Sequence, residues 1–384
     1  MTRPSGAVRT RGLPFMIAGG LLVWANAWGW QSSPGFRGPG DPTAPSWPAL
    51  RILGRTQLPA ARSVARDIRW ASASSVYIAH AFDGVVEVGL DGTRRRLLVP
   101  SQGHVRFEQI PVQSYGSLAV SDSVLAVTSS LSITSRPLKS APGQIFRLEV
   151  RPFAQPEAMD LQGDRVLFLG MRDNIYTPEV HPNGEIAWLG TRSSGWQELK
   201  PVLYDRSGPL MPAYGHCRGK RIGAARFLAD GSFVIVPGFE KGVHFFSADG
   251  RLMRSWTGEE VGLDTECSGI TEQEEVVLGR QPAAWQRWLN RHRTVDAILP
   301  LPQGPGLVVR SWGQDGQVHW LLKVLSGSRV ETYSVPITGR RPTDRLRGDV
   351  RAGTIAFLLS ASGFNGPAER SDPQGEVVLA EMPN

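Results

Sequence analysis

Cysteine is nearly absent from this chain, which contains only Cys217 and Cys267. Neither residue belongs to a Cys/His spacing that is typical of a zinc site. In an exported chain, two thiols predict a single disulfide, here Cys217–Cys267. The alternative reading is a pair of buried free thiols.

Lysine is also scarce, since only five of the 42 basic residues are lysine and the arginines are scattered along the chain. The formal net charge of +7 falls to about +4 if the N-terminal segment that carries Arg3, Arg9 and Arg11 is removed. A nucleic-acid-binding protein needs a concentrated basic stripe. We therefore expect no nucleic-acid partner.

Long hydrophobic runs are missing, and the longest apolar stretch is Leu13 to Trp24. It follows a positively charged start and precedes the small-x-small sequence Ala25-Asn26-Ala27, which predicts a signal peptide over residues 1–27. Its length falls short of the roughly 20 residues that span a bilayer. Residues 28–48 are rich in Pro, Gly and Ser and predict a flexible linker. The mature protein is then secreted or periplasmic, with an uncleaved N-terminal anchor as the alternative.

Catalytic and metal-binding motifs are missing as well. The chain has no HExxH, HxH, G-x-S-x-G, P-loop or dinucleotide-binding glycine pattern. The sequence therefore offers few candidate catalytic groups, and we expect no metal and no cofactor. His244 and His319 alternate within predicted strands, which favours structural roles.

What the chain does contain is a repeated unit of a hydrophobic strand, a tight Asp-Gly turn and another strand. The clearest copy runs from Ala225 to Gly258, with turns at Asp230-Gly231 and Asp249-Gly250. Another copy has turns at Asp83-Gly84 and Asp91-Gly92. Such dipeptides between hydrophobic strands are strong hairpin signals. One unit cannot bury both faces of its sheet, so the copies must pack on one another.

The repeats predict an all-β fold, a six-bladed β-propeller over residues 49–384 in which each blade ideally has four strands. The last blade has only three evident strands. The segment Ala49 to Thr56 would supply the fourth by pairing beside Glu376 to Met382, which closes the ring. The repeated strands and Asp-Gly turns resemble the blades of NHL-type propellers. The resemblance implies the fold, but this architecture is shared by binding scaffolds, lactone hydrolases, lyases and receptor modules.

One face of the predicted ring has tight turns and the other has long loops, which indicates a working face. Both cysteines fall in loops on that face. The segment from Ala283 places Trp285, Trp288 and Leu289 at helical spacing, which predicts a short amphipathic helix over the rim. Trp196 and Trp312 add to an aromatic rim.

Candidate ligand-binding residues lie at strand ends near the predicted channel mouth and in the long loops. They are His80, Arg172, Glu179, His181, His216, Arg310 and Trp312. The residues expected to ring the channel are neutral to basic. They lack the oxygen ligands that a calcium site needs and favour an anionic ligand or a water-filled channel.

These observations favour an exported, non-catalytic, monomeric propeller that binds a protein, peptide or glycan through its long-loop face. The alternative is a hydrolase or lyase with its site at the mouth of the channel. Carboxylates or imidazoles converging at the mouth would favour the enzyme, and an apolar plug would favour the scaffold.

Export is directly testable. If residues 1–27 are removed during export, the intact mass of the exported protein should correspond to a chain that begins at Trp28. A full-length product confined to the cytoplasm would contradict this prediction.

Overall fold

The structure is a computed structural model, which divides by its contacts into two units, Met1–Phe36 and Arg37–Asn384. All described residues belong to the second unit. They are residues 46–59, 64–80, 84–99, 117–121, 124–128, 132–137, 146–149, 154–172, 183–191, 197–199, 204–206, 223–237, 242–263, 293–313, 315–340, 344–360 and 375–383.

Several predicted features lie outside the described residues. They are the signal peptide over residues 1–27, most of the linker, both cysteines of the predicted disulfide, the helix from Ala283, and Trp196. Within the described part of the chain, no helix is long and apolar enough to span a membrane.

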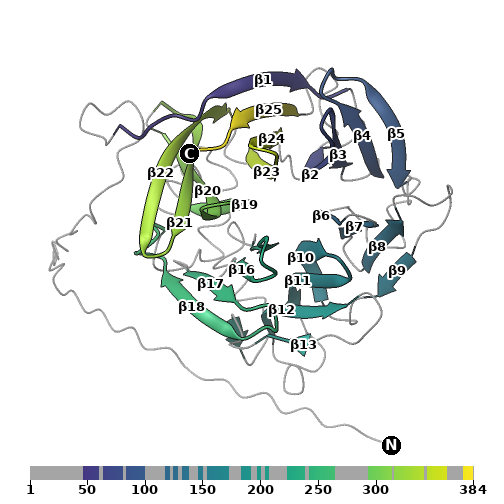
Figure 1. The fold of residues 1–384 in the computed structure, drawn as a ribbon, viewed down its shortest axis with the longest axis vertical. Coiled ribbons are helices and arrows are strands. Elements are labelled where there is room, and N and C mark those ends of the chain that lie inside the picture. Colours follow the sequence, from purple (N-terminus) through teal and green to yellow (C-terminus); the bar gives the residue numbers. More distant parts are fainter. Residues whose placement is uncertain are drawn as a thin grey trace, which may run out of the picture. The chain divides into compact units, whose positions relative to one another are not determined.

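The strands pair into six antiparallel sheets arranged around a common centre (Figure 1). From the centre outward, the first two sheets are β2 (Ala65–Ser72), β3 (Ser75–His80), β4 (Gly84–Gly89) and β5 (Arg94–Val99), and β6 (Leu118–Val120), β7 (Val124–Thr128), β8 (Ser132–Pro137) and β9 (Phe146–Glu149). The third sheet contains β10 (Ala154–Gln162), β11 (Arg165–Arg172), β12 (Asn183–Thr191), β13 (Gln197–Glu198) and β14 (Tyr204–Arg206).

The second half of the chain continues the same arrangement. The fourth and fifth sheets are β15 (Ala224–Phe227), β16 (Phe233–Val236), β17 (Gly242–Phe246) and β18 (Leu252–Thr257), and β19 (Thr294–Leu301), β20 (Gly304–Trp312), β21 (Val318–Ser326) and β22 (Arg329–Gly339). The last sheet combines β23 (Arg345–Arg351), β24 (Thr354–Ser360) and β25 (Glu376–Glu381) with the N-terminal strand β1 (Ile52–Gln57).

The hydrophobic core lies between the sheets rather than at the centre of the ring. Each buried cluster joins neighbouring sheets, as where Phe168 and Trp188 pack with Ala126. Another cluster joins Ile78 of the first sheet to Leu358 of the last. The innermost strands contact one another in the sequence β2, β6, β10, β15, β19, β23 and back to β2. These contacts define an all-β propeller.

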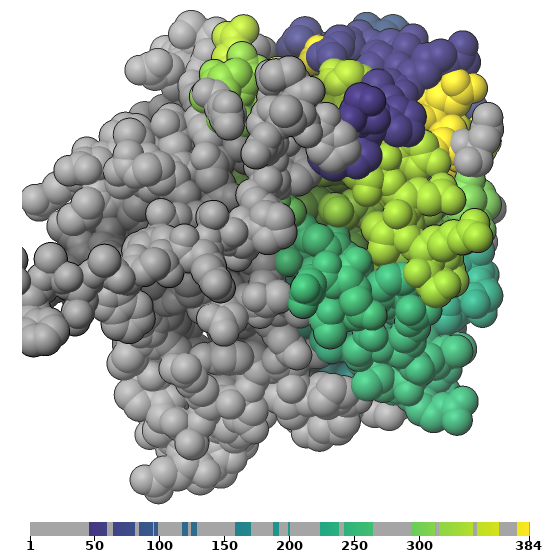
Figure 2. All heavy atoms as spheres, turned by 90° about the vertical axis from the view of Figure 1, so that its left-hand side faces the viewer, coloured from purple at the N-terminus to yellow at the C-terminus, as the bar shows by residue number. Residues whose placement is uncertain are grey.

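The predicted pairing of the N-terminal strand with the last sheet is confirmed. β1 pairs with β25 in antiparallel register, and Arg55 forms a 3.0 Å ion pair with Glu376 across the two strands. Just before β1, the chain also pairs with the neighbouring sheet, because Ser334 of β22 donates its N–H to Pro48 O at 2.9 Å. Figure 2 shows this N-terminal segment (purple) beside β22 (yellow-green). The N-terminal strand therefore contacts two sheets.

The prediction of a six-bladed propeller with ideally four strands in each blade is wrong. Only five of the sheets are regular four-stranded blades, because the sheet of β10–β14 has five strands. In this sheet two short strands share the outer edge of β12. β13 pairs with Trp188 and Leu189, and β14 pairs with Asn183 to Glu185. Pro201 lies between β13 and β14 in the sequence and has no N–H to continue a ladder.

The Asp-Gly turns have the conformation that the sequence predicts. Gly92, Gly231 and Gly250 all have positive φ values near 80–90°. In two of these turns the aspartate also accepts the N–H two residues ahead, at 3.0 Å, as Asp230 does from Ser232. A similar turn at Asp315-Gly316 joins β20 to β21 on the opposite face, so these dipeptides are not confined to one face of the ring.

The turn at the start of β20 provides a stability test. Gly304 has a φ of 138°, and a Cβ at this position would lie 2.1 Å from the carbonyl oxygen of Leu325. Gly304→Ala should therefore lower the free energy of unfolding by at least about 1–3 kcal/mol in denaturant titrations. Gly54→Ala is the control, because nothing lies within 4 Å of its Cβ position. Equal effects of the two substitutions would contradict the assignment of strain to Gly304.

Candidate functional site

The centre of the propeller is lined by buried polar side chains from the innermost strands. Asp67 of β2, Asp160 of β10, Asp296 of β19 and Asp349 of β23 are each less than a tenth exposed. Ser117 occupies the corresponding place just before β6. Buried carboxylates are rare unless they are paired or hydrogen-bonded, so their partners define this site.

Each of these side chains accepts a hydrogen bond from the backbone of the next sheet. Asp67 Oδ2 accepts from Leu118 N at 2.8 Å, and Ser117 Oγ accepts from Met159 N at 3.2 Å. The inner edge of a sheet has backbone N–H groups that no further strand can satisfy. A side chain from the preceding sheet supplies the missing acceptor.

The same link recurs around the ring. The remaining three links are Asp160 Oδ2 with Phe227 N at 2.8 Å, Asp296 Oδ2 with Leu346 N at 3.1 Å, and Asp349 Oδ2 with Trp70 N at 2.8 Å. Within the described ranges, the junction between β15 and β19 lacks such a link. At that junction the inner strand carries Arg226 instead of an aspartate.

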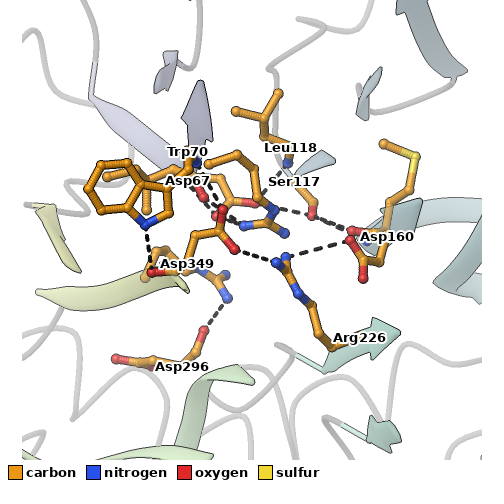
Figure 3. Close-up of polar contacts among 12 residues, drawn as sticks. Asp67, Trp70, Ser117, Leu118, Asp160, Arg226, Asp296 and Asp349 are labelled. Carbon is orange, nitrogen blue, oxygen red and sulfur yellow. Dashed lines mark hydrogen bonds and ion pairs between the residues drawn. The ribbon is translucent and has the colours of Figure 1, made fainter. Parts of the chain in front are cut away.

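Arg226 lies at the middle of this network (Figure 3). Its Nη2 donates to Asp349 Oδ1 from the last sheet, and its Nη1 lies 3.5 Å from Asp160 Oδ1 in the third. The sheets of β15 and β23 are not neighbours in the ring, so Arg226 reaches across the centre. All three side chains are almost completely buried.

Burial and neighbouring charges shift the pKa values of this cluster in opposite directions. Burial disfavours the charged arginine, but the carboxylates of Asp160, Asp349 and Asp67 outweigh it and raise the pKa of the Arg226 guanidinium. Burial raises the pKa of Asp160, and Arg226 and Arg69 oppose that rise. Arg69 is itself paired with Asp67 at 3.0 Å. We conclude that Arg226 stays charged and neutralises the carboxylates around it.

A second group of charged side chains lies near the ends where the inner strands begin. Arg310, near the end of β20, donates to Thr294 Oγ1 and to the carbonyl oxygen of Asp344, each at 3.2 Å. Its Nε also lies 3.7 Å from Asp296 Oδ1. Arg347 donates to the carbonyl oxygen of Asp296. Arginine therefore predominates here, in contrast to the carboxylates around Arg226.

The structure places only some of the predicted ligand-binding residues. His80 and Arg310 are buried at the ends of β3 and β20. Arg172 and Trp312 end β11 and β20, where their backbones pair with neighbouring strands. Glu179, His181 and His216 lie outside the described residues, so the structure tests only part of the predicted site.

The two strand histidines occupy hydrogen-bonded positions. His244 Nδ1 lies 2.8 Å from Ser255 Oγ on the neighbouring strand, and burial lowers the pKa of its imidazole. His319 Nε2 lies 3.0 Å from both carboxylate oxygens of Asp315 in the adjacent turn. Both arrangements agree with the structural roles that the strand alternation predicts.

The central aspartates are not among the site residues predicted from the sequence. Each stands within an inner strand, with apolar residues beside it in two cases, as Asp160 does in Ala-Met-Asp-Leu and Asp296 in Thr-Val-Asp-Ala. That recurrence in successive repeats was the available signal. Two carboxylates do converge, but they converge on a guanidinium inside the ring. Neither an open acid pair nor an apolar plug is observed among these residues.

The fold and the central network define the class of this protein as an all-β propeller. No protein-family model matches the chain, and no curated protein matches it. Among the described residues, no cluster of His, Cys, Asp and Glu could hold a metal ion.

Solved structures similar to this chain include three propeller-type proteins. Regucalcin, a calcium-binding protein from Agrobacterium tumefaciens, is 13% identical with a TM-score of 0.49, covering 87% of this chain and 94% of its own. The WD40 β-propeller domain of Doa1 is 10% identical, with a TM-score of 0.44 and coverages of 87% and 97%. YCF48 bound to D1 peptide is 10% identical, with a TM-score of 0.43 and coverages of 89% and 100%. These likenesses assign no family.

The central network generates a stability prediction. Arg226→Met would leave Asp160 and Asp349 buried without their cation, so the free energy of unfolding should fall by about 3–5 kcal/mol at pH 8. The loss should be smaller at pH 5. A carboxyl whose pKa is raised by burial binds its proton more tightly when folded, so its protonation at lower pH relieves the unpaired charge.

Urea titrations at the two pH values measure both effects. Arg329→Met is the matched control, because Arg329 is exposed on the outer strand β22 and should change stability by no more than about 0.5 kcal/mol. An unfolding free energy that is unchanged by Arg226→Met, or reduced equally at both pH values, would contradict the proposed charge balance.

Proposed function

We propose that this protein is an exported propeller that binds a protein or peptide through its long-loop face and performs no chemistry of its own. A glycan is the other ligand class compatible with an aromatic rim. The NHL-type resemblance belongs to this proposal only as a description of the repeats, because that architecture serves binding and catalysis alike.

The observation that carries the proposal is the engagement of the central carboxylates. Asp160 and Asp349 each accept a backbone N–H and also face the guanidinium of Arg226. A general acid or base must instead face its substrate with an available proton or lone pair. These carboxylates stabilise the ring and are unsuited to acid–base catalysis.

The packing between the sheets also supports a binding role. The sheets are held by continuous apolar clusters and by the hydrogen-bonded inner strands, which fixes the positions at which loops leave the ring. Rigid sheets that present loops are the usual basis of recognition surfaces. The alternative, a hydrolase or lyase at the mouth of the channel, would use Arg172, Glu179, His181, His216 and Arg310.

Two hairpins allow the faces to be tested separately. Asp315-Gly316 joins β20 to β21 on the long-loop face, and Asp249-Gly250 joins β17 to β18 on the opposite face. A small folded domain can be inserted between the two residues of either turn. The probe is a fluorescent peptide selected from a displayed random library against the intact protein.

Insertion at Asp315-Gly316 should weaken peptide binding about tenfold or more, because it obstructs the long-loop face. Insertion at Asp249-Gly250 should leave the Kd within about twofold. Fluorescence anisotropy measures both values. Selection of no binding peptide, or equal weakening by both insertions, would contradict the proposal. Turnover of lactone, ester or phosphoester substrates that is lost in Arg310→Ala would favour the enzyme instead.

A further inference from the structure

Four arginines come together where the innermost strands of three consecutive sheets begin. Arg345 and Arg347 are the first and third residues of β23, and Arg66 is the second residue of β2. Arg310 lies near the end of β20, opposite Thr294, the first residue of β19. The four side chains therefore belong to the fifth, sixth and first sheets of the ring, at the same end of the inner strands.

These guanidinium groups are close enough for their charges to act on one another. The pKa of Arg345 is lowered to about 9, chiefly by burial and then by Arg310, Arg347 and Arg66, while Asp296 opposes the shift. Burial and then Arg347 lower the pKa of Arg66. Arg226 shows the contrasting case, because its surrounding carboxylates raise its pKa. Positive charge at this end thus exceeds the negative charge that the described residues supply.

The carboxylates nearest this cluster are already engaged. Asp296 Oδ2 accepts from Trp320 Nε1 at 2.8 Å and from Leu346 N at 3.1 Å. Asp344 Oδ2 accepts from Arg340 N at 2.8 Å. In the described part of the structure, the buried Nε of Arg345 has no hydrogen-bond partner. A buried guanidinium N–H without an acceptor is costly, so this N–H is a donor that an added acceptor would stabilise.

We propose that Arg66, Arg310, Arg345 and Arg347 form a binding site for an oxyanion, a carboxylate or phosphate group, at the end of the channel where the inner strands begin. The planar guanidinium presents a fork of N–H donors that matches such groups. Several arginines from three sheets can surround one anion. The described carboxylate among them, Asp296, lies 3.7 Å from Arg310 and already accepts hydrogen bonds from Trp320 and Leu346. The site goes beyond the proposed function, because a free oxyanion would bind whether or not a protein partner exists.

Thermal unfolding of the full chain tests the site. Sodium phosphate and sodium acetate are each compared with sodium chloride at matched ionic strength. A ligand that binds only the folded state raises the Tm as its concentration exceeds its Kd, and we expect a rise of about 2 °C or more for at least one oxyanion. A response to phosphate alone or to acetate alone identifies which oxyanion the site prefers. Equal Tm values in all three salts would overturn the proposal.

Arg345→Met provides a readout that a purely structural arginine would not give. Without oxyanion, the variant should have a Tm equal to or above that of the wild type, because it loses a buried charge that Arg310, Arg347 and Arg66 repel. It should also lose the oxyanion response, with binding at least about tenfold weaker by titration calorimetry. Arg329→Met should retain the wild-type response.

A second variant keeps the test decisive if Arg345→Met does not fold. Arg66→Gln keeps a polar group at the start of β2 and removes one of the four charges, so it should also weaken the oxyanion response. Retention of the full response in both variants would place the anion elsewhere and overturn the proposal. None of these outcomes depends on peptide binding, so the two proposals can fail separately.

Discussion

The propeller depends on one recurring interaction, a side-chain oxygen from each inner strand that accepts a backbone N–H of the next sheet. Every inner strand has an edge that no further strand covers, and an unsatisfied buried N–H costs about 1–3 kcal/mol. Asp67, Ser117, Asp160, Asp296 and Asp349 supply acceptors at five junctions. Apolar packing holds the sheets face to face, and these bonds fix the register of their inner edges.

Using aspartate for this purpose brings negative charge into a buried space, so the ring must also contain cations. Arg69 pairs with Asp67 in the same strand, and Arg226 serves Asp160 and Asp349 from the junction that lacks an aspartate. The balance differs along the axis. Carboxylates surround the arginine at one level, whereas arginines gather around Asp296 near the beginning of the inner strands. The charge at the centre of the ring therefore differs from one end of the inner strands to the other.

The turns of this fold and the strand that closes the ring could be predicted from the sequence, whereas the network of side chains at its centre could not. The turns at Asp91-Gly92 and Asp230-Gly231 are encoded by adjacent residues, and the spare N-terminal strand was evident because the last repeat lacks one. The divided outer edge of the third sheet depends on how β13 and β14 share β12, which no local pattern specifies. The network around Arg226 joins residues far apart in the chain, so alternation within one strand could not reveal it.

The last sheet contains both the closing strand β1 at its outer edge and Arg345 and Arg347 on its innermost strand, β23. β1 completes the last sheet through β25 and is joined to the fifth sheet through Pro48 and Ser334. Closure therefore requires contacts between residues more than 280 positions apart, and such contacts carry a large loop-closure entropy. The cluster spans the same three sheets: Arg310 from the fifth, Arg345 and Arg347 from the last, and Arg66 from the first. An anion held by all of them would offset their mutual repulsion and favour the closed ring. In this way a ligand at the centre and the N-terminal strand at the rim would stabilise the same closing sheet.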